Sequence, residues 1–167
     1  MNTRAAATGF LYENEDDGTD DITAARYLEA APDSTEWNNV EWGDWGTEID
    51  GDAQLTGIGE GQAATDAVVA HMENKSITGT AAQLADGLSL DEYSDWFLPS
   101  RDELDLMYQN LHQLGLGGLL AGIYWSSSED SSGAAWYRAF SSGWQHPMTK
   151  IYAYRVRAAR AFGNRAI

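Results

Sequence analysis

The chain has 167 residues, no cysteine and a formal net charge of −16, from 26 acidic and 10 basic side chains. A chain of this length forms one domain that buries enough surface to fold without covalent cross-links. The lack of cysteine excludes a disulfide framework, a thiolate metal site and a cysteine nucleophile. Such an acidic chain repels phosphate backbones, so we expect no nucleic-acid partner.

The charge is unevenly distributed along the chain. Residues 1–100 hold 21 acidic and 3 basic side chains, whereas residues 101–167 hold 5 acidic and 7 basic ones. This pattern fits either a solvated acidic surface or an acidic half that keeps the molecule soluble while the neutral half meets a partner. No stretch approaches the roughly 18 apolar residues of a membrane helix, and residues 1–9 lack the apolar core of a signal peptide. We expect no direct membrane insertion, and secretion only by another route or through an upstream segment.

The first third of the chain is rich in turn residues. Residues 1–12 predict a short strand, and the acidic loop 13–21 follows it. Carboxylates around a glycine can ligate calcium or magnesium, but the spacing does not fit a calcium-binding helix–loop–helix, and a solvated loop is the alternative. The composition of residues 24–31 favours a helix, which Pro32 ends.

Residues 33–59 predict irregular loop with short strands. Three tryptophans, Trp37, Trp42 and Trp45, either pin this loop to a core or form an exposed aromatic platform. A helix is predicted over residues 60–74, because apolar residues recur near a 3.6 period; its expected buried stripe is Ala63, Ala67, Val68 and either His71 or Met72. A short helical piece is predicted over residues 80–88.

A second long helix is predicted to begin at Ser100, where Ser100 and Glu103 form a capping box. Its expected buried stripe is Leu104, Met107, Tyr108, Leu111 and Leu114, and the glycines from Gly115 onward stop it. From Tyr124 the pattern changes to short aromatic-rich runs between Ser/Gly clusters, which predicts antiparallel strands. Strands, two helices and then strands make the fold class α+β.

Three ordered motifs are similar to a known family. They are Tyr93 to Leu104 (YSDWFLPSRDEL), Tyr124 to Glu129 (YWSSSE) and Arg155 to Phe162 (RVRAARAF). They resemble the C-terminal domain family of the Legionella collagen-like protein, in the C-type lectin-like superfamily. Upstream pieces around residues 28–32, 42–43 and 57–62 match as well, so the resemblance covers roughly residues 9–162.

The resemblance implies a loop-rich C-type lectin-like fold, with two helices packed beside small antiparallel sheets, over a single domain 1–167. It also implies an extended segment where residues 24–31 lie. The superfamily includes formylglycine-generating enzymes and the hypervariable receptors of diversity-generating retroelements. In those receptors adenine-directed mutagenesis rewrites positions within the segment that matches residues 124–162, while framework residues stay fixed.

The residues of this segment suit a binding surface, because rigid aromatics among serine and glycine give contact area at low entropy cost. We expect ligand contact from eight side chains: Asp130, Tyr137, Ala139, Ser142, Trp144, His146, Tyr152 and Tyr154. Trp125, Trp136, Phe140 and Phe162 match framework positions and are expected in the core. Adenine replacement in an asparagine codon cannot yield Trp144, Gln145, Met148 or Lys150, so these fit less well as diversified positions, although Trp144 lies in a glycine-bounded turn where burial is difficult.

Two roles are open for the arginines Arg155, Arg157 and Arg160. They either bind an anionic ligand or form ion pairs with Glu129, Asp102 or the acidic first half of the chain. We expect no enzymatic activity: the formylglycine-generating branch needs cysteines, and the three histidines show no metal-binding spacing. No catalytic residue, metal ligand or cofactor is therefore assigned, apart from the acidic loop 13–21.

These observations predict a non-enzymatic ligand-binding protein, the hypervariable receptor of a viral or microbial diversity-generating retroelement. Its partner would be a protein or glycan on a cell surface, and its location the cell surface or a virion. The alternatives are a fixed-specificity adhesin that binds polysaccharide and a structural module of a viral fibre tip, in which the domain would form an oligomer.

Overall fold

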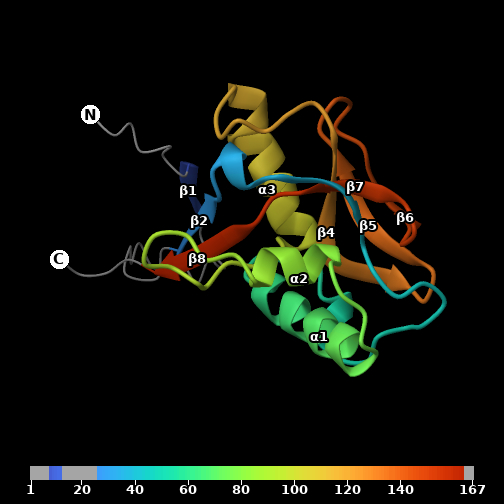
Figure 1. The fold of residues 1–167 in the computed structure, drawn as a ribbon. Coiled ribbons are helices and arrows are strands. Elements are labelled where there is room, and N and C mark those ends of the chain that lie inside the picture. Colours follow the sequence, from blue (N-terminus) through green and yellow to red (C-terminus); the bar gives the residue numbers. More distant parts are fainter. Residues whose placement is uncertain (1–7, 13–25, 164–167) are drawn as a thin grey trace, which may run out of the picture.

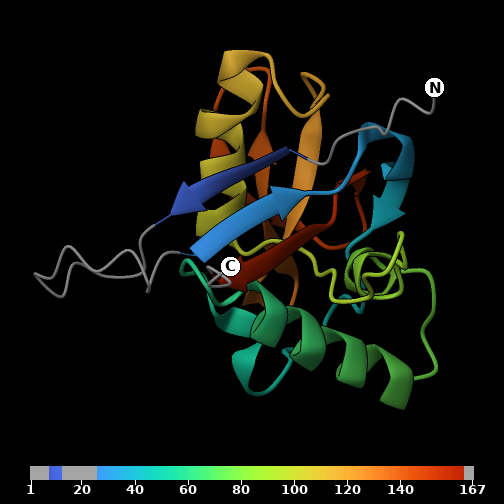
Figure 2. The same cartoon turned by 90° about the vertical axis from the view of Figure 1, so that its left-hand side faces the viewer.

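The computed structural model describes residues 8–12 and 26–163. Two sheets lie on opposite sides of the molecule, with the helices packed between and below them (Figure 1). The three-stranded sheet is antiparallel in the order β1-β2-β8, and its strands lie side by side in Figure 2. The five-stranded sheet has the order β3-β7-β4-β5-β6, and its one parallel pair is β4 with β7. The fold class is therefore α+β, as the sequence predicts.

The described elements follow in chain order. The strands are β1 (Thr8–Tyr12), β2 (Arg26–Ala30), β3 (Trp37–Glu41), β4 (Ile123–Ser131), β5 (Ala134–Ala139), β6 (Gln145–Thr149), β7 (Ala153–Val156) and β8 (Ala159–Gly163). The helices are α1 (Gly61–Asn74), α2 (Ala81–Asp86) and α3 (Arg101–Asn110). The helices predicted over 60–74 and from Ser100, and the helical piece within 80–88, are all confirmed.

The alanine-rich segment 24–31 is a strand where the structure describes it, and the helix that its composition favours is wrong. Strand β2 is the central strand of its sheet, with β1 on one side and β8 on the other. Two rows of ladder hydrogen bonds and the burial of Leu28 and Ala30 outweigh a helix propensity of a few tenths of a kcal/mol per residue.

Two hydrophobic cores lie on opposite faces of the five-stranded sheet. Neighbouring residues of β4 point into different cores, because side chains alternate along a strand. Trp125 packs with α1, α2 and the buried Trp42, whereas Tyr124 packs with α3, β2 and Phe140. This alternation makes β4 the shared wall of the molecule.

The predicted buried stripes are partly correct. In α1 the buried side chains include Ala64, Val68 and Met72, while Ala63 and Ala67 are half-buried. In α3 the structure confirms Leu104, Met107 and Leu111, but Leu114 is 66% exposed. The reason is that α3 ends at Asn110 and a short 3-10 turn follows, which breaks the helical period.

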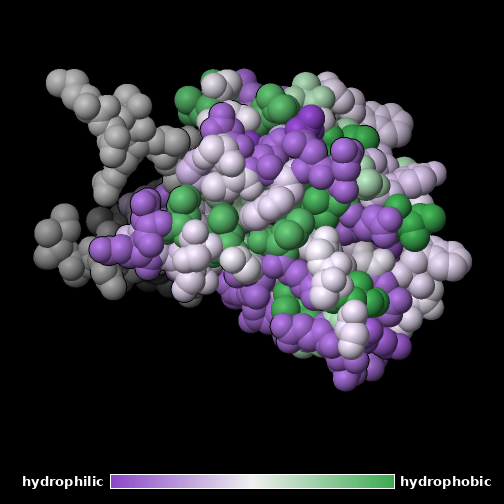
Figure 3. All heavy atoms as spheres, in the orientation of Figure 1, coloured by the Kyte–Doolittle hydropathy of each residue, from purple (hydrophilic) through white to green (hydrophobic). Residues whose placement is uncertain are grey.

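Exposed apolar side chains do not merge into one large patch on the face seen in Figure 3, where separate hydrophobic groups lie between hydrophilic ones. Large exposed apolar residues include Trp45, Leu116, Trp144, Ile151 and Tyr152. Single apolar side chains on a surface are ordinary, so only their position and their support give them meaning.

Helix α3 begins with the predicted capping box, and its carboxylate is fully buried. Glu103 accepts hydrogen bonds from the backbone N–H of Ser100 (2.9 Å) and of Gly59 (3.0 Å). Gly61 is required beside it, because a Cβ there would lie 2.0 Å from the Glu103 Oε2. Burial raises the pKa of Glu103 to about 7, against the opposite effect of its backbone donors.

A buried ion pair between Lys150 and Glu129 joins the ends of β6 and β4 in the five-stranded sheet. The Lys150 Nζ lies 2.5 Å from a carboxylate oxygen of Glu129, and both side chains are fully buried. The same Nζ donates to the backbone oxygens of Asp44 (3.2 Å) and Thr47 (2.9 Å), and Glu129 accepts from the backbone N–H of Ile49. These bonds tie the ends of β4 and β6 to the loop that follows β3.

Replacing this lysine should destabilise the fold strongly, because K150M leaves Glu129 buried without its partner. We expect the free energy of unfolding to fall by about 3–5 kcal/mol. Urea unfolding followed by circular dichroism measures this loss, and the exposed Lys75 provides the matched control K75M, which should change stability by less than about 0.5 kcal/mol. A loss under about 1 kcal/mol for K150M would contradict the structural role of the pair.

Glu103 should make stability depend on pH. Its folded pKa of about 7 lies above the ordinary 4.5, so its contribution is present below 4.5 and is lost as the pH rises to 7. The variant E103Q does not titrate between pH 4.5 and 7. At every pH its side-chain NH₂ faces one of the backbone N–H groups that donate to Glu103, so its stability is lowered by a constant amount. Between about pH 5.5 and pH 8 the wild type should lose about 2 kcal/mol relative to E103Q. Denaturant unfolding at several pH values checks this, and a constant difference between the two proteins would refute it.

Candidate functional site

Strands β5 and β6 form a ribbon with two different faces. They pair in antiparallel register, with Tyr137 opposite His146 and Trp136 opposite Pro147. Directly opposite residues share a face and successive residues alternate. Tyr137 and His146 therefore share one face, whereas Trp136 belongs to the other.

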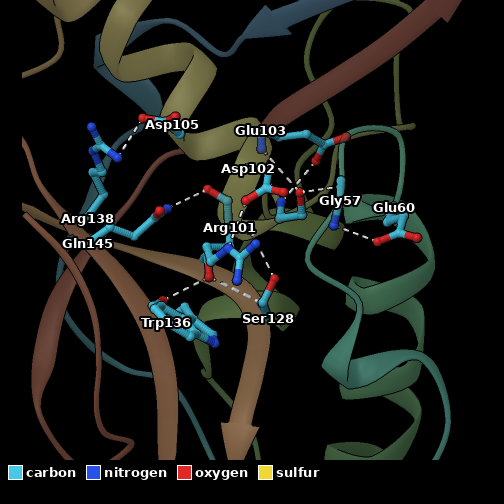
Figure 4. Close-up of polar contacts among 12 residues, drawn as sticks. Gly57, Glu60, Arg101, Asp102, Glu103, Asp105, Ser128, Trp136, Arg138 and Gln145 are labelled. Atoms are coloured by element: carbon cyan, nitrogen blue, oxygen red, sulfur yellow. Dashed lines mark hydrogen bonds and ion pairs between the residues drawn. The ribbon is translucent and has the colours of Figure 1, made fainter. Parts of the chain in front are cut away.

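The face that carries Trp136 is fixed to α3 (Figure 4). The Arg138 guanidinium pairs with Asp105 at 2.5 Å, and the Arg101 guanidinium lies 5.1 Å from the ring of Trp136. The Gln145 side chain donates to the backbone oxygen of Arg101 at 2.8 Å. These contacts support the ribbon from behind, while Tyr137 and Met148 of the opposite face pack partly against the core that contains Trp125.

On the opposite face, Tyr137 of β5 and His146 of β6 lie with two tyrosines from elsewhere, Tyr154 of β7 and Tyr152 of the turn before it; we call these four residues the tyrosine patch. The Tyr137 and Tyr154 rings lie 5.6 Å apart, and Tyr152 lies 6.1 Å from Tyr154. Beneath them is the fully buried Trp125, whose ring is 4.7 Å from that of Tyr154. Tyr152 is 49% exposed and His146 is exposed, while the other two tyrosines are half-buried.

The environment of Tyr154 explains its chemistry. Burial raises the pKa of its phenol, and the neighbouring Tyr137 and Tyr152 add to this effect. The hydroxyl therefore stays protonated at neutral pH and serves as a hydrogen-bond donor and acceptor rather than as a base. Tyr154 thus presents a flat apolar ring with a neutral polar tip, a combination suited to binding.

The structure brings four of the eight predicted contact residues together and separates the rest. Asp130 lies near the β4–β5 turn, whereas Ser142 and Trp144 lie in the β5–β6 turn at the other end of β5; all three are exposed. Ala139 is buried, so its expected exposure is wrong. Ala139 ends β5. Its backbone N–H donates to the Trp144 oxygen and its backbone oxygen accepts from the Gly143 N–H, and these two hydrogen bonds close a tight turn.

The predicted framework residues also divide. Trp125 and Phe140 are buried as expected, and Trp136 is half-buried under Arg101. Phe162 is 39% exposed, so its core assignment is wrong. Phe162 lies near the end of β8, where its ring stacks on that of Tyr27 with the centroids 5.3 Å apart and remains partly open to solvent.

The three C-terminal arginines pair with carboxylates of the first hundred residues. Arg155 and Arg157 both bind Glu36, at 2.7 and 2.6 Å, and Arg157 is fully buried. Arg160 pairs with Glu29 and Asp95, both at 3.0 Å. The pairing with the acidic first half is one of the two alternatives predicted for these arginines, but Glu129 binds Lys150 and Asp102 binds Arg101 instead.

Sequence reasoning missed Lys150 and Trp45 as organising features. Lys150 is buried with its charge paired, and Trp45 is 61% exposed although its neighbour Trp42 is fully buried. The sequence held one signal that Lys150 is unusual: it is the only lysine in the neutral half of the chain. Its partner could not be read from spacing, since Glu129 is 21 residues away.

Within the described residues, no group of three or more His, Asp or Glu side chains could hold a metal ion. The predicted acidic loop 13–21 lies outside these residues. No helix in the described part of the chain is both long and apolar enough to cross a membrane. No protein-family model matches the chain, and no curated protein is significantly similar to it.

Proposed function

We propose that this protein is a non-enzymatic ligand-binding domain with a C-type lectin-like fold, and that the tyrosine patch contacts the ligand. The observation that carries the proposal is the grouping of Tyr137, His146, Tyr152 and Tyr154 on one supported sheet face. Tyrosine gives large contact area with only two side-chain torsions to fix, which is why binding loops use it heavily.

The position of the patch supports display. Strands β1 and β8, through which the described chain enters and leaves, belong to the three-stranded sheet, and β5 and β6 lie on the other side of the molecule (Figure 1). Attachment through either end would leave β5 and β6 on the side of the molecule away from the three-stranded sheet (Figure 1). This arrangement suits a cell-surface or virion location with a protein or glycan on a cell surface as partner.

A hypervariable receptor of a diversity-generating retroelement is the specific function we propose. All four patch residues can arise from adenine replacement in asparagine codons, and so can the exposed Asp130 and Ser142. The side chains beneath and behind the patch, such as Trp125, Lys150 and Arg157, are buried and bonded. Such a division lets surface residues change while the buried contacts persist.

Natural variation tests this function most directly. We expect substitutions among members of the source population to cluster in codons 130–154 at adenine-derived positions, with Trp125, Gly143 and Arg157 unchanged. Sequencing the 3′ end of the gene from many members measures this. Sparse and uniform variation would overturn the receptor function and favour a fixed-specificity adhesin, whose polysaccharide a glycan array would identify, or a fibre-tip module, which light scattering would detect as a stable oligomer.

Tolerance to substitution tests the patch itself. Tyr152→Ala should cost less than about 0.5 kcal/mol because its side chain is half exposed, and Tyr137→Ala or Tyr154→Ala should cost about 1–2 kcal/mol. Trp125→Ala should cost about 3–5 kcal/mol, because it empties the core beneath the patch. Protease resistance of a displayed library measures all four. If replacing Tyr152 unfolds the protein, the residue is a core element and the surface is wrongly mapped.

A further inference from the structure

A groove of about 510 Å³ opens beside the five-stranded sheet, outside the tyrosine patch. The first half of the chain supplies most of its lining, which includes Asn39, Glu41, Asp44, Trp45, Thr78 and Ile151. It adjoins the patch, because Ile151 directly precedes Tyr152 and Glu41 pairs with Ala153 across β3 and β7. Nothing in the proposed function uses it.

The exposed Trp45 is held by a fixed backbone. On one side of it, Asp44 is held twice: its backbone oxygen accepts from the buried Lys150 Nζ, and its carboxylate lies 2.9 Å from the His71 Nε2. On the other side, the Gly46 N–H donates to the Ser132 oxygen at 2.9 Å, and the Thr47 oxygen accepts from Lys150. The indole, which is 61% exposed, is therefore presented to solvent by a rigid loop at a cost in apolar burial.

The groove has an acidic character. Glu41 is exposed and has no ion-pair partner among residues 27–163. The hydrogen bond from His71 holds the pKa of Asp44 below its usual value, so this carboxylate stays charged. No lysine or arginine of the described chain lines the groove, and the surrounding half of the sequence is strongly acidic. The carboxylates of Glu41 and Asp44 disfavour an anion in the groove.

We propose that this groove binds a cationic group attached to an apolar stem, as in an arginine or lysine side chain of a peptide. The cation would lie over the indole face of Trp45, with Glu41 as its counter-charge and with Asn39 and Thr78 as hydrogen-bond acceptors. Cation–π contact favours tryptophan over other aromatics, and a carboxylate adds a charge-assisted hydrogen bond. This inference does not depend on the tyrosine patch, since no patch residue lines the groove.

The test uses N-acetyl-arginine amide as probe and the citrulline compound of the same shape as its neutral match. Two-dimensional NMR follows the indole N–H of Trp45, which the variant W45F assigns by removing it. We expect the arginine probe to shift this signal, to bind about tenfold more tightly than the citrulline probe, and to weaken as salt is added. Thermal melting verifies that each variant is folded.

Paired variants separate the groove from the general field of an acidic protein. E41Q and E92Q each remove one exposed carboxylate, but Glu92 does not line the groove. E41Q should weaken the arginine probe about fivefold and E92Q less than about twofold. W45A should abolish binding, whereas W144A, which removes another exposed tryptophan, should leave it unchanged.

Three results would overturn the proposal. Equal binding of the arginine and citrulline probes, or equal loss in E41Q and E92Q, would show that the groove does not select a cation. A shift of the Trp45 signal by a neutral oligosaccharide but not by arginine would assign the groove to sugars. No shift at the solubility limit of the probe would remove the site. Tyr152→Ala leaves the groove lining intact, so failure of the patch and failure of the groove are distinguishable.

Discussion

The buried pair of Lys150 and Glu129 is the constraint on which the side of the molecule with both proposed binding surfaces depends. Two charges out of water are costly unless hydrogen bonds satisfy them, and here three backbone groups complete the bonding. The pair joins the ends of β4 and β6 to the loop after β3. The groove of Trp45 and the tyrosine patch meet at the turn that begins at Lys150, because Ile151 lines the groove and Tyr152 belongs to the patch.

The uneven charge of the chain produces ion pairs between its acidic first half and its neutral second half. The first hundred residues carry the excess of carboxylates, and three of these, Glu29, Glu36 and Asp95, pair with arginines of β7, β8 and the link between them. The most buried arginine, Arg157, also donates to the backbone oxygens of Ala31 and Gly117. The acidic half thus holds the neutral half in place, and the remaining carboxylates give the surface its negative field.

The two proposed binding surfaces differ in chemistry because they differ in origin. The tyrosine patch comes from the last third of the chain and offers aromatic rings over Trp125, and α3 supports its strands β5 and β6 from behind. The groove comes mainly from the first half and combines Trp45 with carboxylates. If the patch varies between members and the groove does not, the groove would supply a constant contact beside a changing one.

The sequence by itself determined the features that depend on neighbouring residues. The capping box at Ser100, the periodicity of residues 60–74 and the aromatic and serine pattern after Tyr124 are local signals, and helices and strands lie where they predict. Tertiary structure alone decided which surfaces are exposed. It made β2 a strand, left Trp45 in solvent, buried Ala139 and paired Lys150 with groups up to 106 residues away. These outcomes depend on the energy of contacts between distant segments, which no local spacing records.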